Sequence, residues 1–319
     1  NSRLRSAFED FDRARAERRE QRNSGEVMNC LEKFRIPMGA VVKLADFDPK
    51  FSDEDEDKSG SRLKLNELRR EIADVQYRLY AETKRSLLIC LQAPDVGGKD
   101  GVVRHVIASM NPQGCRVVGF KQPTPEALAH DFLWRIERQT PKRGEVVAFN
   151  RSRYEDVLVA RLHDLVPKEA WQKRYDQIND FERRLVANDT HILKLFLHIS
   201  KDEQLERFKR RLDDPDRNWK ISEADYAERK YWDDYEVAYE AVHSRCSTAD
   251  APWFVIPSDH KWFRNLAVAR IIAKTMRDLG IEVPESTVDF EDIRKKYHHA
   301  EQRRKEANVH PDGESGAPR

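Results

Sequence analysis

The sequence comprises 319 residues, 39% of them hydrophobic and 36% charged, and its 58 Lys and Arg residues nearly balance 57 Asp and Glu residues. This composition predicts one large soluble domain with its own core, and the formal charge of +1 excludes a global attraction to nucleic acid or to an anionic membrane. No apolar run approaches the roughly 20 residues that span a bilayer, and the N-terminal residues lack the apolar segment of a secretory signal.

Residues 1–60 are expected to form an extension ahead of the main domain. Residues 1 to about 24 are strongly charged but carry apolar residues at helical spacing, which predicts an amphipathic helix suited to packing on a partner subunit. Residues 52–60, SDEDEDKSG, have the composition of a solvated charged linker. From Leu63 to about Thr83 apolar residues recur at helical spacing, so a packing helix is expected directly before the first strand.

Five apolar runs predict β-strands, each followed by a segment of helical character. Because the runs lack polar alternation, we expect a parallel sheet between two layers of helices, a three-layer α/β domain over about residues 61–295. Ligands of such sheets bind at the carboxyl ends of the strands. The tail, 296–319, is expected to be disordered. The five apolar runs are residues 87–92, 115–120, 145–150, 191–200 and 251–257. The helix after the first run is expected to begin at about residue 101, the next to cover 125–138, the third to begin at about 154 and the fourth at 201, and the last to end at 278.

The cysteines and histidines give little functional signal. The four cysteines are scattered without CxxC spacing, which fits a reducing cytoplasm and predicts neither a zinc site nor a disulfide, and Cys90 is expected to pack as a small hydrophobe. His130 is expected to be structural, and Arg135 is the better candidate for contact with an anion. There is no Ser/His/Asp arrangement and no aromatic platform for nucleic-acid bases. The cysteines are Cys30, Cys90, Cys115 and Cys246.

The segment APDVGGKDG, 93–101, has the features of a phosphate-binding loop. It ends a predicted strand and opens a helix, where backbone N–H groups and the helix dipole favour anions, and its glycines let a phosphate approach closely. Lys99 adds a full positive charge. The segment departs from GxxxxGK[ST], because Ala93 replaces the first glycine and Asp100 replaces the hydroxyl residue. The alternative is an ordinary glycine-rich turn with a helix-capping aspartate.

Asp95 places a carboxylate inside this anion-binding loop. Its charge would repel a phosphate unless a divalent cation lay between them, and oxygen ligands of both kinds suit Mg²⁺. We therefore expect Asp95 to take the metal-binding role that the missing hydroxyl leaves, with Mg²⁺ or Mn²⁺ as the cofactor. Asp100 is expected to cap the helix, where the dipole favours its charge.

The third run leads into a dense polar cluster, FNRSRYED. Phosphotransfer proteins carry a carboxylate near the metal at such a position. Since Asn150 occupies the strand end, the charge would come from Glu155 or Asp156, and Arg151 is suited to hold phosphate oxygens bidentately. The alternative is a helix-capping box in which Ser152 and Glu155 exchange hydrogen bonds with the backbone.

A basic segment over about residues 207–232 is predicted to be a mobile lid. Arg207 and Arg211 share a helix face, the helix breaks at Pro215, and Lys220 follows after a loop. Cations opposite the loop would stabilise the charge on a transferring phosphoryl group, and a closing lid would bring them there. A solvated, charged helix face is the alternative.

Together these segments resemble the polyphosphate kinase 2 family, most closely its third subclass, which phosphorylates both nucleoside mono- and diphosphates. The resemblance runs from about Phe34 to about Leu279 and rests on ordered blocks that include LQAPDVGGKDG, FNRSRYEDVLV, RFKRRLDDPDRNWKISEADYAER and APWFVIPSDHKWFRN. It implies a thymidylate-kinase-like P-loop fold with a helical lid. Pro94 and Gly97 depart from the residues expected there, and Pro94 is expected to stiffen the loop.

The resemblance also implies roles for individual residues. Those expected to be catalytic are Asp95, Lys99, Arg151, Arg207 and Arg211, with the metal held by Asp95 and Glu155. Those expected to bind substrate are Gly97, Gly98, Asp100, Gly101, Lys121, Arg135, Asn150, Glu155 and Lys220.

The expected reaction is reversible, Mg²⁺-dependent transfer of phosphoryl groups from inorganic polyphosphate to AMP, ADP or another purine nucleotide, in a cytoplasmic homodimer or homotetramer that binds neither nucleic acid nor membrane. Two alternatives stay open. One is an ATP-dependent nucleoside monophosphate kinase on the same scaffold, and the other is a non-enzymatic polyphosphate- or nucleotide-binding protein.

Overall fold

The computed structural model describes residues 32–53, 58–285 and 288–309. The chain divides into two units after Val283. The N-terminal helix predicted up to about residue 24 lies outside the described residues, as does the middle of the predicted linker, at 54–57.

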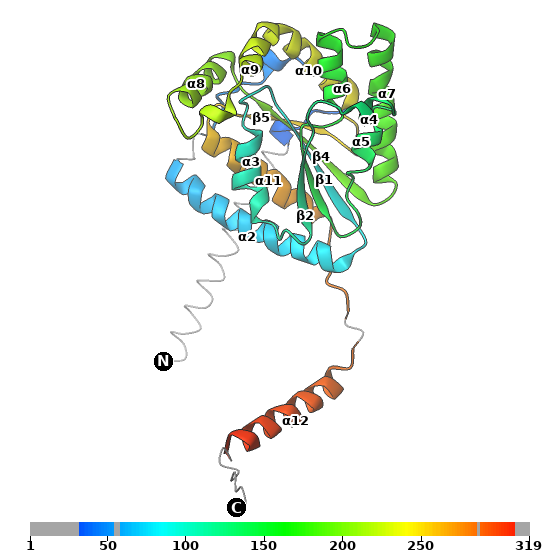
Figure 1. Cartoon of the computed structure of the whole chain (residues 1–319), viewed down its shortest axis with the longest axis vertical. Helices are drawn as coiled ribbons and strands as arrows, with labels where there is room; N and C mark the ends of the chain where they lie inside the picture. The colour runs from blue at the N-terminus through cyan, green and yellow to red at the C-terminus, as the bar shows by residue number, and fades with distance from the viewer. Residues whose placement is uncertain (1–31, 54–57, 286–287, 310–319) are drawn as a thin grey trace, which may run out of the picture. The chain divides into compact units, whose positions relative to one another are not determined.

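The first unit is built on a five-stranded parallel sheet in the order β2-β3-β1-β4-β5 (Figure 1). Strand β1 (Ser86–Gln92) lies at its centre, where Ile89 pairs with Ala148 on one side and Leu193 on the other. All seven residues of β1 are buried, as expected for a parallel strand covered on both faces. The other strands are β2 (Cys115–Gly119), β3 (Val146–Asn150), β4 (Thr190–His198) and β5 (Trp253–Pro257).

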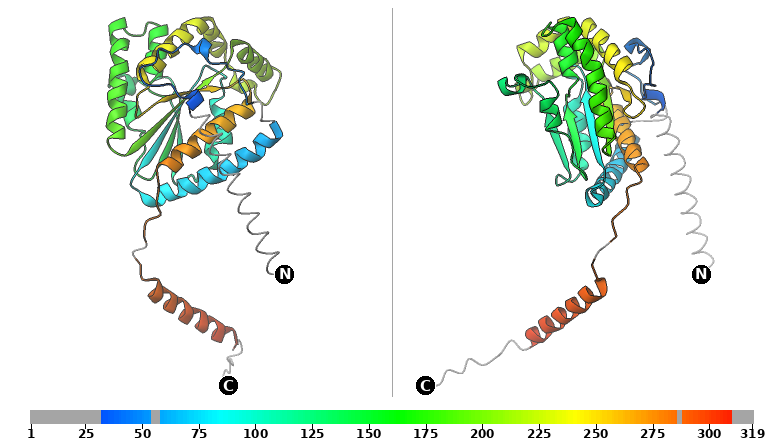
Figure 2. Two further views of the ribbon diagram at one scale, coloured as in Figure 1. Left: turned by 180° about the vertical axis from the view of Figure 1, so that it is seen from behind. Right: turned by 90° about the vertical axis from the view of Figure 1, so that its right-hand side faces the viewer.

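Helices cover both faces of this sheet (Figure 2). Successive side chains of β1 point to opposite faces, so that Ile89 enters one hydrophobic core and Cys90 the other. The first core includes α2 (Lys58–Glu82), α3 (Lys99–His105) and α11 (Lys261–Asp278), and the second includes α6 (Glu155–Leu162), α7 (Lys168–Val186) and α10 (Trp232–Cys246). Shorter helices are α4 (Pro125–Leu128), α5 (Trp134–Glu137), α8 (Lys201–Leu212) and α9 (Glu223–Ala227), with 3₁₀ turns η1 (Leu44–Asp46), η2 (Ile107–Ser109), η3 (Asn218–Lys220) and η4 (Glu228–Tyr231).

The three-layer α/β prediction and all five predicted strands are confirmed, with strand ends shifted by one or two residues. The helix predicted over 125–138 was wrong, because it forms as α4 and α5 instead. The Asp131 carboxylate accepts a hydrogen bond from Leu133 N (2.9 Å) in the segment between them, which makes a local turn that competes with continuous helix. Helix α7 was not among the predicted elements.

The second unit contains helix α12 (Phe290–Val309), which covers much of the segment expected to be a disordered tail. Opposite charges at helical spacing support it, as in the ion pairs of Lys296 with Asp292 (2.5 Å) and Lys305 with Glu301 (3.4 Å). The remaining residues, 310–319, lie outside the described part.

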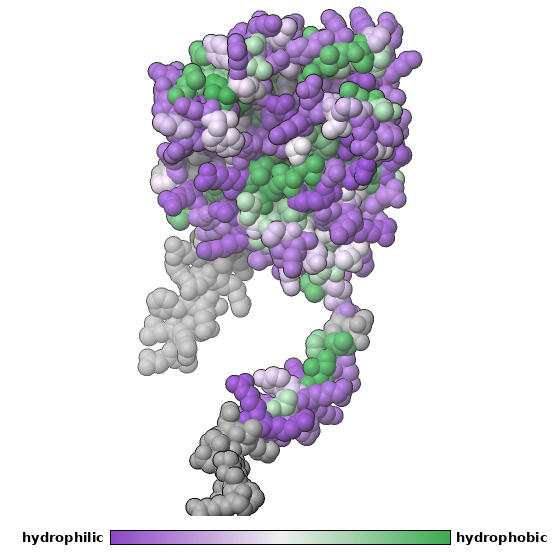
Figure 3. Space-filling model, in the orientation of Figure 1, coloured by the Kyte–Doolittle hydropathy of each residue, from purple (hydrophilic) through white to green (hydrophobic). Residues whose placement is uncertain are grey.

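The described cysteines are free, as predicted, but Cys90 does more than pack: its Sγ accepts a hydrogen bond from Arg153 Nη1 (3.2 Å). Among the described residues, we find no helix with the length and apolar character required to traverse a bilayer. Figure 3 shows hydrophilic residues over most of one face of the molecule, with apolar areas between them.

The fold predicts an uneven sensitivity to side-chain truncation across the sheet. Ile89→Ala at the buried centre of β1 should lower the free energy of unfolding by about 2–5 kcal/mol, because it removes apolar contacts and leaves a cavity. Val117→Ala on edge strand β2, where Val117 is 44% exposed, should lower it by less than about 1 kcal/mol. Urea denaturation measures both, and equal losses would contradict the assignment of β1 to the centre.

Candidate active site

The predicted phosphate-binding loop connects β1 to α3 at the carboxyl edge of the sheet. It makes an internal turn in which Gly97 N donates to Pro94 O (3.0 Å), and Val96 and Gly98 both have positive φ, 64° and 115°. Gly98 is the N-cap residue of α3, so the first N–H groups of that helix point out of the loop. The segment thus has the geometry of an anion-binding helix N-terminus.

Two glycines of the loop are required by the close approach of Arg264, a buried residue of α11. A Cβ built on Gly98 would lie 2.0 Å from Arg264 Nη1, and one on Gly101 would lie 2.6 Å from Arg264 Nη2. No other residue type therefore fits at these positions without displacing the guanidinium.

Lys99, the first residue of α3, lies inside the loop and is only 8% exposed. Its Nζ donates to Ala93 O (2.7 Å), so the ammonium is held at the centre of the loop. Burial lowers the pKa of Lys99, and nearby Arg151 lowers it further, whereas Asp95 and Glu155 oppose the shift. An incoming phosphate would meet a cation here that has few water molecules to lose.

Arg151 links the two carboxylates that the sequence marked as metal ligands. Its Nη2 donates to Asp95 Oδ1 (2.5 Å), and its Nη1 lies 3.8 Å from Glu155 Oε2. Burial raises the pKa of Glu155, while the charges of Arg151 and Lys99 counteract that rise. Asp95 and Glu155 thus come from different strand ends and meet around one guanidinium.

The alternative interpretation of this segment, a helix-capping box, is not what the structure shows. The N-cap of α6 is Tyr154 and it makes no side-chain cap hydrogen bond, while Ser152 Oγ accepts from Gln92 Nε2 (3.4 Å). Glu155 faces a pocket beside Arg151 instead. Of the two acidic candidates, only Glu155 joins the cluster.

The prediction that Asp100 caps α3 is wrong, because Gly98 takes the N-cap position. The Asp100 carboxylate accepts a hydrogen bond from Asn150 Nδ2 (3.0 Å) and lies 3.9 Å from Lys220 Nζ. Asp100 therefore links the loop to the end of β3 and to the predicted lid.

An open cleft of about 950 Å³ extends from the loop across the lid segment and the start of α11. It contains most of the predicted site residues. From the loop these are Asp95, Gly97, Gly98, Lys99, Asp100 and Gly101, and from elsewhere Lys121, Asn150, Arg151, Arg207, Arg211 and Lys220.

The cleft also holds basic residues to which no role was assigned from the sequence, above all Lys261 and Arg264 of α11. Burial lowers the pKa of Lys261 to about 8, and the neighbouring Arg207 and Arg210 add to the effect. Burial and Arg207 lower the pKa of Arg264 to about 9. The sequence contains one indication of such a role, because Lys261 and Arg264 are two basic residues at the start of the helix that follows the last strand.

Arg207 is placed differently from the expectation of a lid cation that reaches over the substrate. It is only 4% exposed, and its Nη1 donates to Val96 O (3.1 Å) and Gly97 O (3.0 Å) of the loop. Its Nη2 donates to the carbonyls of Ser258 and Asp259. Its Nε donates to Glu203 Oε1 (2.8 Å), so all three nitrogens are engaged within the protein, and the Nη groups tie the loop to the residues that follow β5.

Other lid residues are held more loosely. Arg211 Nη1 donates to Lys220 O (2.6 Å), and helix α8 ends at Leu212, before the predicted break at Pro215. The Lys220 side chain is 35% exposed at the cleft. Arg211 and Lys220 thus remain the lid cations that can turn toward an anion.

Arg135 is not brought to the cleft. It pairs with Asp156 (3.1 Å) and donates to Lys121 O (2.9 Å), so its predicted anion contact is replaced by an internal ion pair. His130 stacks on Trp134, with ring centroids 4.1 Å apart, in agreement with its predicted structural role.

The donor set around Arg151 suits a hard divalent cation. Among the described residues, no cluster of three or more His, Cys, Asp or Glu side chains forms a cage for a metal ion. Asp95 and Glu155 provide two carboxylates at one edge of the anion-binding loop. Mg²⁺ is commonly bound by one or two carboxylates together with water and substrate phosphates, so the residues present fit it.

Residues 54–283 match the polyphosphate kinase 2 family. The chain is 45% identical over 264 residues to an AMP/ADP-polyphosphate phosphotransferase of Meiothermus ruber, covering 82% of this chain and 99% of that protein. It is 44% identical to an ADP-polyphosphate phosphotransferase of Rhodopseudomonas palustris, covering 80% and 93%. The crystal structure of a polyphosphate kinase 2 from Arthrobacter aurescens superposes with a TM-score of 0.82 at 40% identity, covering 85% and 96%.

Gly98→Ala should impair the loop more than any comparable change nearby. The positive φ and the contact with Arg264 predict a loss of about 1–3 kcal/mol in unfolding free energy and weaker binding of inorganic triphosphate. Gly119→Ala is the control for stability, because an added Cβ there meets nothing within 4 Å, although Gly119 also lines the cleft. Urea denaturation and titration calorimetry give both quantities. Identical behaviour of the two variants would show that the loop does not need its left-handed residue.

Proposed function

The chain belongs to the polyphosphate kinase 2 family, and on that premise we propose that it transfers phosphoryl groups from inorganic polyphosphate to AMP and ADP, reversibly and with Mg²⁺. The observation that carries this proposal is the cluster of Asp95, Arg151 and Glu155 beside Lys99, at the head of a basic cleft. A polyanionic donor matches the charge of this cleft. The nucleotide acceptors are taken from the similar proteins of Meiothermus ruber and Rhodopseudomonas palustris.

Positioning and charge neutralisation do most of the work in such a reaction, because phosphoryl transfer needs little covalent chemistry from the protein. The attacking phosphate oxygen of the acceptor is already ionised near neutral pH, so the protein needs no general base. Lys99 and the N–H groups of the loop hold the donor phosphates. Arg151 lies where it can contact both the donor and the acceptor.

The lid supplies the remaining charge. Arg211 and Lys220 turn from their present partners toward the phosphate chain as the lid closes, and closure excludes water that would otherwise hydrolyse the chain. Arg207 keeps the loop fixed to β5 during this movement.

Asp95 and Glu155 would hold Mg²⁺, or Mn²⁺ in its place. The cation would supply positive charge between these carboxylates and the anionic oxygens of the substrate. This is the reason that an aspartate is tolerated in the loop. Arg151, if released from Asp95 in this way, would be free to contact the phosphates.

Polyphosphate as the sole phosphoryl donor should convert ADP to ATP in the presence of Mg²⁺. A parallel reaction without polyphosphate separates the proposal from an ATP-dependent monophosphate kinase, which could form ATP and AMP from two molecules of ADP in the absence of polyphosphate. The assay also separates the proposal from a binding protein, which would retain polyphosphate without turnover. Absence of product with both long and short chains would refute the proposed function.

Asp95→Asn should lower kcat on the order of 100-fold, because it removes a charged metal ligand, and excess Mg²⁺ should restore part of the loss. Asp180→Asn is the matched control, since Asp180 forms an exposed ion pair with Arg183 on α7. Initial rates over a Mg²⁺ series measure the effect. Wild-type turnover by Asp95→Asn at low Mg²⁺ would contradict the role given to Asp95.

Lys261 should make donor binding depend on pH. Its pKa is lowered to about 8, so its positive charge is present below that pH and is lost above it, and the Kd for polyphosphate should rise as pH increases through about 8. Lys261→Arg keeps the charge and should flatten this dependence. Calorimetric Kd values between pH 7 and pH 9 provide the test, and an unchanged profile in Lys261→Arg would exclude Lys261 as the source.

A further inference from the structure

The segment from Arg151 to Glu155 presents its two end residues to the site and buries the three residues between them. Arg151 and Glu155 line the pocket at the site, whereas Ser152, Arg153 and Tyr154 between them are each 0% exposed. The orientation of the two functional side chains is therefore set by how the three buried residues are held.

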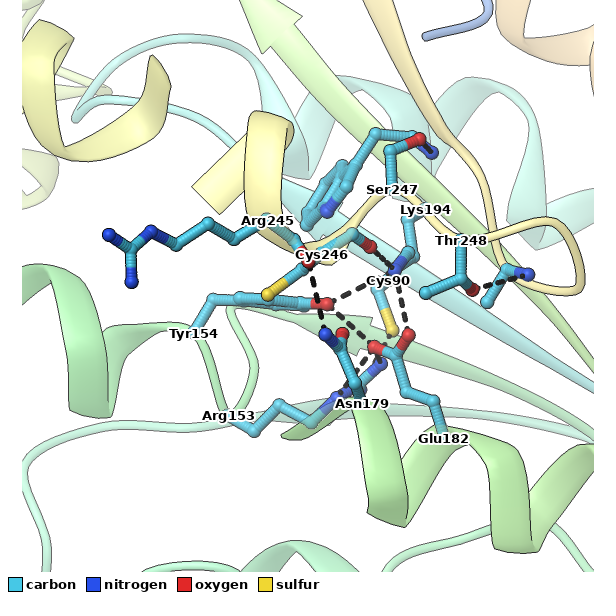
Figure 4. A network of polar contacts seen from close by, with 12 residues as sticks. Cys90, Arg153, Tyr154, Asn179, Glu182, Lys194, Arg245, Cys246, Ser247 and Thr248 are labelled. Atoms are coloured by element: carbon cyan, nitrogen blue, oxygen red, sulfur yellow. Dashed lines mark hydrogen bonds and ion pairs between the residues drawn. The ribbon is translucent and has the colours of Figure 1, made fainter. Parts of the chain in front are cut away.

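Glu182 of α7 is the centre of the contacts that hold this segment. Figure 4 shows Arg153 and Tyr154 converging on its carboxylate from one side and Lys194 of β4 from the other. Arg153 Nε donates to Glu182 Oε1 (3.1 Å), Tyr154 Oη donates to the same oxygen (2.6 Å), and Lys194 Nζ donates to Oε2 (2.7 Å). One carboxylate thus joins the segment after β3 to α7 and β4.

Lys194 completes the network. Besides Glu182, its Nζ donates to Tyr154 Oη (3.1 Å) and to Cys246 O at the end of α10 (2.5 Å). Arg153, Glu182 and Lys194 have side chains no more than 2% exposed. Burial alone would raise the pKa of Glu182, but Lys194 and Arg153 outweigh it and keep that pKa lowered, so the carboxylate stays charged.

Such a network is a poor way to gain stability. Buried ion pairs lose hydration that their attraction barely repays, and well-packed apolar residues of similar volume often stabilise a fold as well or better. What charged groups with directional hydrogen bonds do provide is one defined geometry. That geometry is needed at Arg151, whose φ of 67° is unfavourable for a residue with a side chain and persists only where its surroundings fix it.

We propose that Glu182 and Lys194 are positioning residues for phosphoryl transfer: through Arg153 and Tyr154 they hold the backbone from which Arg151 and Glu155 reach the substrate. The inference rests on the proposed function for its kinetic readout. Neither residue lines the cleft or the pocket around Arg151, so any effect on the site is indirect, and the hydrogen bonds to Arg153 and Tyr154 lead to the segment that carries Arg151 and Glu155.

A double-mutant cycle between Lys194→Met and Arg151→Met provides the test. Lys194→Met should lower kcat on the order of 10-fold with little change in KM for ADP, because a small displacement of a catalytic group is costly. In the Arg151→Met background, the same change should lower kcat by a clearly smaller factor, because Arg151 is already absent and only the displacement of Glu155 still lowers the rate. Independent, multiplying losses would overturn the proposal.

Thr190→Val is the matched control. Thr190 is the first residue of β4, four residues before Lys194, and its Oγ1 accepts a buried hydrogen bond from Ser86 Oγ (2.9 Å). Thr190→Val should lower the free energy of unfolding. Its effect on kcat should be the same in the wild-type and in the Arg151→Met background. If Lys194→Met fails to fold, Tyr154→Phe carries the same cycle, because it deletes only the hydroxyl that joins Glu182 to Lys194.

The crystal structure of Lys194→Met, or of Tyr154→Phe, gives a readout that does not depend on turnover. Displacement of Arg151 from Asp95 would support the positioning role even if the wild-type protein proved inactive with polyphosphate, a result that would refute only the proposed function. An unchanged contact between Arg151 and Asp95 would overturn the positioning role while leaving the proposed function intact.

Discussion

The contact of one guanidinium with two carboxylates, Arg151 with Asp95 and Glu155, is the constraint on which the site depends. It brings like charges together at the edge of a loop whose helix terminus and Lys99 attract anions. The carboxylates are tolerated there because a cation lies between them. In the proposed reaction Asp95 and Glu155 would hold a divalent metal in its place, and the guanidinium would be free to contact the phosphates. The carboxylates in the loop would then contribute to phosphate binding, because they would hold the cation that attracts the phosphate oxygens.

Rigid elements hold this arrangement from both faces of the sheet. On the face of α3 and α11, Arg207 ties the loop to the end of β5, and Arg264 packs against its glycines. On the face of α6 and α7, the Glu182 network fixes the segment that follows β3. Among the basic residues of the predicted lid that line the cleft, Arg207 is buried, whereas Arg210, Arg211, Arg217 and Lys220 are partly or fully exposed. This distribution suits the proposed arrangement of a fixed loop and a movable lid.

The pattern of neighbouring residues in the sequence predicted the sheet and the loop well. The strands were indicated by apolar runs without polar alternation, and the loop by glycines before Lys99 at the end of a strand. It failed where the structure depends on distant parts of the chain. Arg207 was expected over the substrate, but its donors meet carbonyls of the loop and of β5. Glu182 gave no signal, since a charged residue in a helix usually faces solvent, and the basic pair of Lys261 and Arg264 was assigned no role. Asp100 and Ser152 fitted capping patterns but found tertiary partners instead.

The most direct test of the account is a crystal structure with Mn²⁺ and a short phosphate chain, in which anomalous scattering locates the metal. We predict an anomalous peak within coordination distance of Asp95, Glu155 and a phosphate oxygen, with Arg151 turned from Asp95 onto the phosphate chain. A phosphate chain bound along the loop while Asp95 keeps its contact with Arg151 and no metal lies between them would contradict it.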